Sequence, residues 1–282
     1  MMPRALIAVV AACVALMSLS ACGESNTSGE LGVLEGVGRL PGYDFWAPVT
    51  LPDGVELQLP LPEGGPVGGR VTGNRVLLVG DSIFASTAKR YGNEMCDTLT
   101  KLGWQVAVEA QAGEFVDFGS RVLGRRWEEG WDTAVVFLGT NFDGNIVRYE
   151  EKLREMFDVL SQNPFVVLTT AEFRPKQLEV NEVIKRLAGE YGNVTVLDWA
   201  AVANSNGLIG RDGVHLTADG RAVLATAVAR SLEFSRDRTN GQCLRPVFRD
   251  DSKVLDAMPT TVADETMTTD AVEDGGATTV VP

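Results

Sequence analysis

The segment Val-Gly-Asp-Ser-Ile-Phe, residues 79–84, contains a serine that could act as a nucleophile. It follows an apolar run, at a point where a strand would pass into a helix. A serine hydroxyl is a weak nucleophile until a neutral imidazole accepts its proton, and His215 is the single histidine in the chain. Turns after strands also favour Gly, Asp and Ser, so Ser82 needs further partners before a catalytic role follows.

Asp212 stands three residues before His215, in the segment Arg-Asp-Gly-Val-His-Leu-Thr at residues 211–217. A carboxylate beside the imidazole would hold its tautomer and stabilise the imidazolium that forms. Asp212 could instead cap the loop or form a local salt bridge. We predict that Ser82, Asp212 and His215 form a catalytic triad for acyl transfer, and that Asp81 is a structural turn residue.

Acyl transfer also requires N–H donors for the oxyanion of the tetrahedral intermediate. Three candidates follow predicted strands: the Ser82 N–H at the start of a helix, the Gly113 N–H and the Asn141 side-chain amide. The dipole of the helix would favour negative charge near Ser82. Asn141 could be only a turn residue, Gly113 could only relieve backbone strain, and Gly119 is a rival to Gly113. We predict an oxyanion hole formed by Ser82, Gly113 and Asn141.

Five apolar runs predict the elements that position these residues. The predicted strands are RVLLVG (75–80), WQVAVEA (104–110), TAVVFLG (133–139), FVVLTT (165–170) and VTVLD (194–198). Continuous apolar runs suit strands buried on both faces of a parallel sheet. Helices are predicted near residues 83–101, 117–129, 146–161, 176–190 and 218–234. This alternation predicts an α/β fold, a three-layer α/β/α domain with a five-stranded parallel sheet whose ligands lie beyond the carboxyl ends of the strands.

The candidate residues fall in four blocks that together resemble the SGNH (GDSL-type) hydrolases. The blocks are Gly-Asp-Ser with Ser82, Gln-Ala-Gly with Gly113, Gly-Thr-Asn with Asn141, and Asp-Gly-Val-His with Asp212 and His215. The resemblance covers about residues 74–235. It implies a flavodoxin-like fold and ester hydrolysis or acyl transfer without a metal or organic cofactor.

The chain departs from the family pattern in two places. Ile83 stands where the family has leucine, and the third block continues as GTNFDG, so no role is carried over to Asp143. The Gly-x-Ser-x-Gly elbow of the α/β-hydrolases is absent from the sequence, which argues against that neighbouring class.

Residues 1–22 are typical of a bacterial secretion signal. Arg4 precedes an apolar stretch over residues 5–17, which is too short to favour a membrane span. Leu-Ser-Ala-Cys at residues 19–22 matches a lipobox, so we predict cleavage before Cys22 and a diacylglycerol on its sulfur. An ordinary cleaved signal with a chance cysteine is the alternative. We therefore expect an extracytoplasmic protein, lipid-anchored to the bacterial cell membrane.

Two cysteines, Cys96 and Cys243, lie in the predicted folded part. An even pair in an oxidising compartment predicts one disulfide, and two separate buried thiols are the alternative. One histidine and two distant cysteines cannot supply a zinc ligand set, so no metal site is predicted.

The composition changes toward both ends of the chain. We predict a flexible tether over residues 23–39, a Pro- and Gly-rich arm over 40–73, a hydrolase domain over 74–246 and an acidic, Thr-rich disordered tail over 247–282. The segment RVLGRRWEEGW (121–131) predicts a packed helix with a solvated basic face, with a carbohydrate-facing patch as the alternative. The net charge of −13 argues against nucleic-acid binding, which needs basic patches.

The sequence predicts a serine esterase. Its expected surface location and its resemblance to SGNH domains that act on cell-envelope glycans imply short-chain, acetyl-type esters on carbohydrate as substrates, with lipid and thioester substrates as the alternatives. Its expected partners are a small ester or an acylated glycan, and the membrane through the lipid anchor. An O-acyltransferase would use the same triad to move the acyl group to a glycan hydroxyl. A catalytically silent binding module is a third possibility, and the intact triad argues against it.

Overall fold

The computed structural model of the chain describes Phe45 and residues 47–205 and 207–249. The predicted signal sequence, the tether over 23–39 and most of the predicted tail lie outside these residues, as does Cys22. In the part of the chain that is described, no helix is both long enough and apolar enough to cross a membrane.

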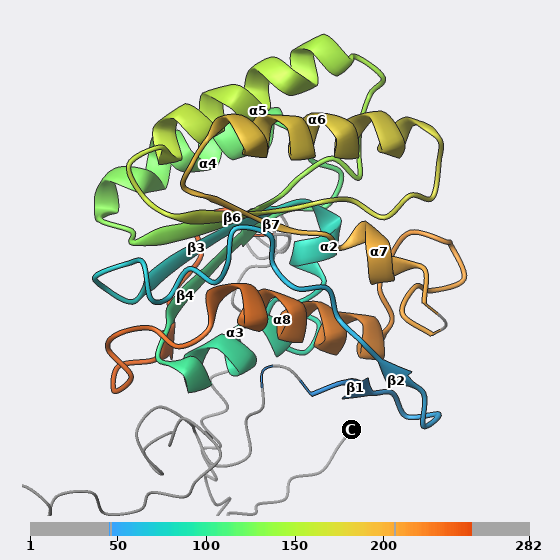
Figure 1. The fold of residues 1–282 in the computed structure, drawn as a ribbon, viewed down its shortest axis with the longest axis horizontal. Helices are drawn as coiled ribbons and strands as arrows, with labels where there is room; N and C mark the ends of the chain where they lie inside the picture. The colour runs from blue at the N-terminus through green and yellow to red at the C-terminus, as the bar shows by residue number, and fades with distance from the viewer. Residues whose placement is uncertain (1–44, 46, 206, 250–282) are drawn as a thin grey trace, which may run out of the picture. The chain divides into compact units, whose positions relative to one another are not determined.

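A parallel sheet forms the middle layer of the fold (Figure 1). Its strands are β3 (Arg75–Gly80), β4 (Gln105–Ala110), β5 (Thr133–Phe137), β6 (Phe165–Leu168), β7 (Val194–Leu197) and β8 (Gln242–Cys243). Their order across the sheet is β7-β6-β5-β3-β4-β8, and every neighbouring pair is parallel. The predicted α/β architecture is confirmed, and the five apolar runs form β3 to β7.

The predicted count of five strands is wrong, because β8 adds a sixth. β8 has only two residues, both exposed, and no apolar run marks it in the sequence. Backbone hydrogen bonds hold it beside β4: the Gln242 N–H donates to the Trp104 carbonyl at 3.1 Å, and the Leu244 N–H donates to the Val106 carbonyl at 2.7 Å. Backbone pairing and a disulfide, rather than burial of β8 itself, therefore make this strand.

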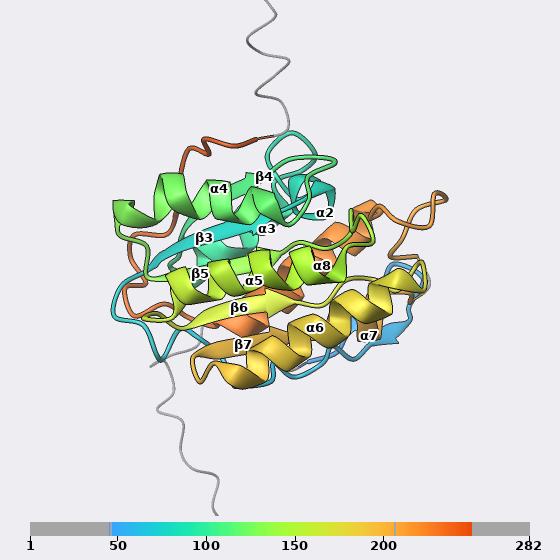
Figure 2. The ribbon, with the colours of Figure 1, turned by 90° about the horizontal axis from the view of Figure 1, so that it is seen from above.

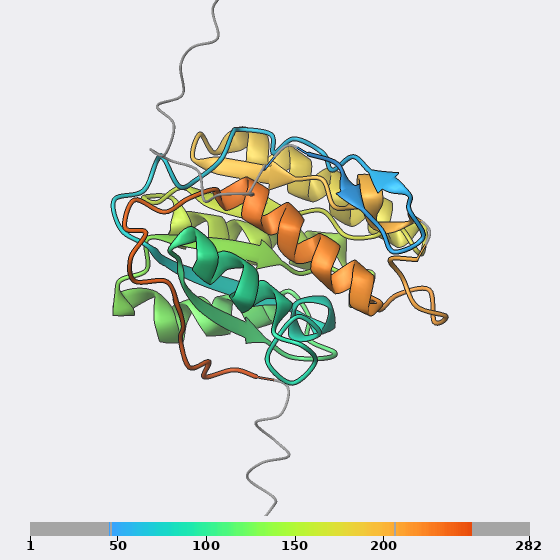
Figure 3. The same ribbon diagram turned by 90° about the horizontal axis from the view of Figure 1, so that it is seen from below.

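Helices cover both faces of the sheet. On one face lie α4 (Asp117–Arg126), α5 (Ile146–Leu160) and α6 (Lys176–Glu190), which form a row in Figure 2. On the other face lie α3 (Glu94–Leu99) and α8 (Ala218–Leu232), seen in Figure 3. The described residues also form the short helices α2 (Ser82–Ala85) and α7 (Ala200–Ala203), and single 3₁₀ turns follow α3 and α4 at Thr100–Leu102 and Trp127–Glu129. The segment predicted as one helix over 83–101 is therefore two, α2 and α3, joined by a loop.

The described part of the N-terminal arm packs against the domain. It begins with a small hairpin of β1 (Val49–Thr50) and β2 (Glu56–Leu57). Further along, Glu63 forms an antiparallel bridge with Val196 of β7, with two backbone hydrogen bonds of 2.9 Å. The Val67 N–H then donates to the carbonyl of Ser231 in α8 at 2.9 Å. The arm thus covers the β7 edge of the sheet, an edge that would otherwise offer unpaired backbone groups.

The segment that follows β8 is held along β4 by a buried carboxylate. Glu109 of β4 is fully buried, and it accepts hydrogen bonds from the Val247 N–H at 3.0 Å and the Phe248 N–H at 2.6 Å. Its charge is paired with Arg126 of α4, whose side chain is also buried. Arg126 is therefore not part of a solvated basic face. Backbone pairing with β4 extends to Arg249, past the predicted domain end at residue 246.

The predicted disulfide is present between Cys96 of α3 and Cys243 of β8, which are 147 positions apart in the sequence and have a Cα–Cα distance of 5.8 Å. A loop of this length predicts a stabilisation of about 5 kcal/mol in the chain-entropy model. Replacing both cysteines with serine should therefore lower the free energy of unfolding by about that amount. Urea denaturation of the two proteins measures it. A loss under about 1 kcal/mol would mean that the bond restrains little of the unfolded chain.

Candidate active site

Ser82 is the first residue of α2, directly beyond the carboxyl end of β3. The turn between them needs a glycine at position 80, because a Cβ there would lie 2.7 Å from atoms of the Phe84 side chain. Phe84 is fully buried and packs edge-on against Phe137 of β5. The glycine thus lets the helix turn back sharply over the sheet, which places the Ser82 hydroxyl at the strand ends.

His215 lies between Ser82 and Asp212. Its Nε2 atom is 3.1 Å from Ser82 Oγ, and its Nδ1 atom is 2.7 Å from Asp212 Oδ2. The other oxygen of Asp212 accepts the N–H groups of Val214 and His215, each at 3.0 Å. The loop is closed by the Gly210 N–H, which donates to the His215 carbonyl at 2.7 Å. Residues that are 133 positions apart in the sequence therefore form one hydrogen-bonded chain.

The charge distribution around these three hydrogen-bonded side chains suits His215 as a general base. Hydrogen bonds from the Val214 N–H, the His215 ring and the His215 N–H lower the pKa of Asp212 to about 2. Asp212 is therefore ionised at neutral pH, and its carboxylate accepts the Nδ1 proton of His215. That tautomer leaves the Nε2 lone pair facing the Ser82 hydroxyl. The His215 and Asp212 side chains are about half exposed, at 52% and 53%, so the site is open to solvent.

The two other predicted donors lie on neighbouring loops. Gly113 follows β4 and has φ +78°, a conformation that favours glycine. Asn141 follows β5, and its Nδ2 atom donates to the Glu114 carbonyl at 3.1 Å, which joins its loop to the Gly113 loop. A side-chain amide carries two N–H groups, so one remains for a substrate oxygen.

Gly119, the rival to Gly113, has a packing role. It lies inside α4, and a Cβ on it would be 1.9 Å from the Met156 sulfur of α5. Its N–H donates to the Val116 carbonyl at 3.1 Å. Gly119 therefore allows α4 and α5 to approach closely, and Gly113 is the glycine that stands among the strand-end loops.

Asp81 joins the loops that carry Ser82 and Asn141. It is fully buried, and its two oxygens accept hydrogen bonds from the Ile83 N–H at 3.0 Å and from the Thr140 N–H at 3.2 Å. The predicted turn residue thus also fixes the distance between the candidate nucleophile and a candidate oxyanion donor. Burial raises the pKa of Asp81 to about 6, although hydrogen bonds from Ile83, Thr140 and Gly139 oppose the rise.

This shift predicts a pH-dependent stability that Asp81→Asn should abolish. The pKa of Asp81 is near 6 when folded and near 3.8 when unfolded, so the folded state binds the proton more tightly. The unfolding free energy should therefore fall by about 3 kcal/mol as pH rises from about 3 to 7, relative to the variant. Urea denaturation of both proteins across that range measures the difference. Parallel curves for the two would contradict it.

The comparisons with known proteins bear on the fold. The sequence matches no family model and no curated protein. A solved structure of a G-D-S-L family protein from Desulfitobacterium hafniense is similar, with 16% sequence identity and a TM-score of 0.50 over 56% of this chain and 99% of that chain. The chain has an SGNH hydrolase-like fold.

Two more solved structures resemble the chain less well. A family 3 carbohydrate esterase from Clostridium thermocellum is 16% identical, with a TM-score of 0.46 over 55% of this chain and 93% of that chain. The C-terminal catalytic domain of peptidoglycan O-acetyltransferase A from Streptococcus pneumoniae is 19% identical, with a TM-score of 0.47 over 56% of this chain and 92% of that chain.

Two residues of α6 support the Gly-Thr-Asn segment that contains Asn141, and little in the sequence points to them. Gln177 is fully buried and its Nε2 atom donates to the Thr140 carbonyl at 3.3 Å. The Lys176 ammonium donates to the Phe142 carbonyl. The carbonyls on either side of Asn141 are therefore both held from α6. The one available signal was that a glutamine occupies a position on the buried side of an amphipathic helix.

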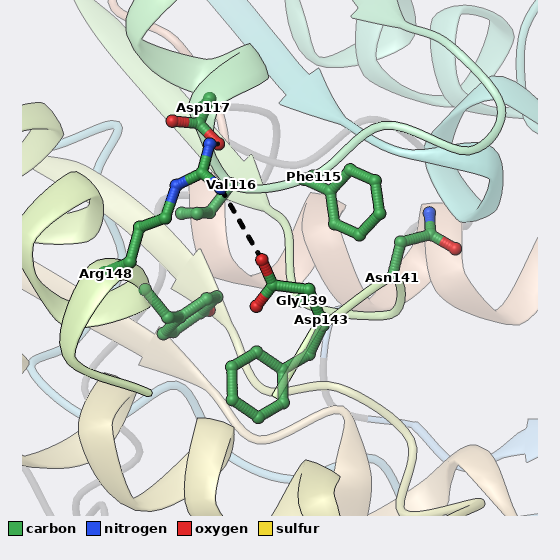
Figure 4. A pocket seen from close by; sticks show the side chains of 9 residues that line it. Phe115, Val116, Asp117, Gly139, Asn141, Asp143 and Arg148 are labelled. Atoms are coloured by element: carbon green, nitrogen blue, oxygen red, sulfur yellow. Dashed lines mark hydrogen bonds and ion pairs between the residues drawn. The ribbon is translucent and has the colours of Figure 1, made fainter. Parts of the chain in front are cut away.

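A shallow pocket of about 460 Å³ lies beside His215 in this SGNH-like fold. Its lining combines aromatic and charged side chains: Phe115, Thr140, Asn141, Phe142, Asp143, Phe173, Arg174, Lys176, Val214 and His215. A smaller neighbouring pocket shares Phe115, Asn141, Phe142 and Asp143 with it, and Figure 4 shows the ion pair of Arg148 with Asp143 in its lining. In the described part of the chain, no group of three His, Cys, Asp or Glu side chains could hold a metal ion.

Proposed function

We propose that the protein is an extracytoplasmic serine esterase that hydrolyses short-chain, acetyl-type esters on cell-envelope carbohydrate. The observation that carries the proposal is the hydrogen-bonded chain of Ser82, His215 and Asp212, with distances of 3.1 and 2.7 Å. This order of hydroxyl, imidazole and carboxylate is what a serine needs to become a nucleophile.

In the first half of the reaction, Ser82 Oγ attacks the ester carbonyl and His215 Nε2 takes its proton. The carbonyl oxygen becomes an oxyanion, held by the N–H groups of Ser82 and Gly113 and by the Asn141 amide. When the tetrahedral intermediate collapses, the bond to the alcohol breaks and His215 returns the proton to the alcohol oxygen. The product is an acyl group on Ser82.

In the second half, water replaces the alcohol. His215 takes a proton from the water as it attacks the acyl carbonyl, and the same donors hold the second oxyanion. Collapse releases the carboxylic acid and returns the proton to Ser82 Oγ. No metal or organic cofactor takes part in the proposed steps.

The lining of the pocket supports a small acyl group on a polar alcohol. Phe115 is 48% exposed and Phe173 is half-buried, so both rings offer faces on which a sugar could pack. Asp143, Arg174 and Lys176 line the same pocket, and charged walls do not suit a long acyl chain.

The proposed location rests on the N-terminal sequence. A diacylglycerol on Cys22 would anchor the protein outside the cytoplasm, where the Cys96–Cys243 disulfide can persist. The mature domain would then act on the cell envelope around it.

An O-acyltransferase is the second candidate, because one observation favours it as well. His215 is 52% exposed, so a sugar hydroxyl could approach the acyl-enzyme in place of water. The same residues would serve both reactions. A silent binding module would not need this aligned trio of side chains.

Product analysis separates these functions. The purified full-length protein is incubated with p-nitrophenyl acetate or an O-acetylated oligosaccharide, with and without an unacetylated acceptor oligosaccharide. We expect free acetate in amounts equal to the alcohol released. Acetyl groups recovered on the acceptor would assign the transferase reaction instead. Release no faster than in buffer, for every ester tried, would overturn the proposed function.

A further inference from the structure

The pocket beside His215 carries positive charge in a chain whose net charge is −13. Its charged lining residues, apart from the histidine, are Asp143, Arg174 and Lys176. The one carboxylate among them, Asp143, is already 3.6 Å from the guanidinium of Arg148. The two cations therefore dominate the charge that a ligand would meet.

Arg174 is available for a ligand. In the described residues no carboxylate forms an ion pair with Arg174 or Lys176, whereas many other arginines of the domain do form such pairs. The Arg174 guanidinium lies 5.3 Å from the centre of the Phe173 ring. Stacking on a ring restrains the side chain and leaves its N–H edge free to bind an anion.

Lys176 adds charge from a fixed position. Its ammonium donates to the Phe142 carbonyl and lies 5.7 Å from the centre of the Phe142 ring. It is half-buried, so solvent screens its charge less than that of an exposed lysine. Arg174 thus offers a planar set of donors and Lys176 a nearby fixed charge.

We propose that the alcohol part of the ester carries an anionic group, a carboxylate or a phosphate, which Arg174 binds with help from the charge of Lys176. This inference rests on the proposed esterase function and names the class of its substrate: acylated anionic sugars. Both anions match the guanidinium donors, while the Phe115 and Phe173 rings would pack on the sugar. A neutral acetylated sugar would leave the Arg174 donors without a ligand.

Three aryl acetates of similar shape test the inference: para-acetoxybenzoate, para-acetoxyphenyl phosphate and the neutral para-acetoxybenzamide, together with the meta isomer of each. The value of kcat/KM is measured for the full-length protein and for Arg174→Gln and Arg174→Glu. The control is Arg125→Gln, which changes the net charge equally from an exposed position on α4 that does not line the pocket. The esters differ in the reactivity of their leaving groups, but this difference is the same for every protein. It therefore cancels when the anionic-to-neutral ratio of kcat/KM in a variant is compared with the ratio in the wild type. Ser82→Ala defines the rate that does not depend on the site.

We expect Arg174→Gln to lower the ratio of kcat/KM for the anionic ester to kcat/KM for the neutral ester by about tenfold, which is the effect of losing one exposed charge-assisted hydrogen bond. Arg174→Glu should lower this ratio further. Arg125→Gln should leave the ratio unchanged. The benzoate and the phosphate show which anion is preferred. Ser82-dependent turnover with equal ratios in wild type and Arg174→Gln would overturn the inference and leave the esterase in place. Absence of Ser82-dependent turnover on every ester would overturn the proposed function, and the inference with it.

Discussion

Ser82→Ala should lower kcat for an acetyl ester by about 10⁶-fold, because removal of a triad serine leaves only the contribution of binding and the oxyanion donors. The geometry gives the reason. The hydroxyl is 3.1 Å from His215 Nε2, and the structure places no other hydroxyl in hydrogen-bond contact with that atom among the described residues. Steady-state kinetics with p-nitrophenyl acetate measure the effect.

Ser86→Ala is the matched control for that variant. Ser86 lies four residues further on, at the C-terminal end of α2, and its Oγ donates to the Ile83 carbonyl at 2.7 Å. The control should retain most of the activity, because its hydroxyl serves only the helix end. If Ser82→Ala folds normally and keeps more than about a tenth of the wild-type rate, another group is the nucleophile.

Asp212→Asn should lower kcat by about 10⁴-fold while leaving the loop folded. The amide oxygen can still accept the backbone N–H groups of Val214 and His215, which Oδ1 accepts now. The amide NH₂ would then face Nδ1 of His215, where Oδ2 now lies at 2.7 Å. Two donors cannot share this contact, so the ring would take the other tautomer and present an N–H to Ser82.

The matched control for this variant is Asp219→Asn, which removes an acidic residue from the first turn of α8. Kinetics of the double variant Asp212→Asn/His215→Ala extend the test. Because Asp212 acts through His215, the double variant should be no slower than His215→Ala alone. Additive losses in the double variant would show that Asp212 acts independently of the imidazole.

The sequence indicates where the candidate site residues lie in the fold, because each of them stands beside an element that local sequence marks. Ser82, Asn141 and His215 each stand next to a buried apolar run or a helix start, and the carboxyl ends of parallel strands meet at one edge. A three-residue spacing is enough to place Asp212 beside His215 on one loop. Only the topology of the sheet is then needed to bring the blocks together.

The parts that the sequence does not predict depend on long-range pairing. β8 has no apolar run, and it exists because Cys243 is tied to Cys96 and its neighbours bond to β4. Arg126 reads as a surface cation, yet it is buried against Glu109, a residue that stands 17 positions earlier in a different element. Neither partner can be identified before the fold brings them together.

The hydrogen bonds that hold the loop of Asn141 in place are also long-range and cannot be predicted from local sequence. The hydrogen bonds of Asp81 and Gln177 to Thr140 span 59 and 37 residues. A buried Asp after a strand and a Gln on a helix are both common. Their structural role becomes visible only when both side chains are seen to bond to the backbone of Thr140. Together they hold the backbone beside Asn141 from two sides.

The measurement that tests the central claim most directly is the mass of the protein after reaction with a small sulfonyl fluoride, which traps activated serines. We predict one adduct per chain, located on Ser82 by peptide mapping. The adduct should form far more slowly in Asp212→Asn, because the imidazole then lacks its base tautomer, and should be absent in Ser82→Ala. Adduct formation at another residue, or no adduct in a protein that still turns over esters, would contradict the assignment of Ser82 as the nucleophile.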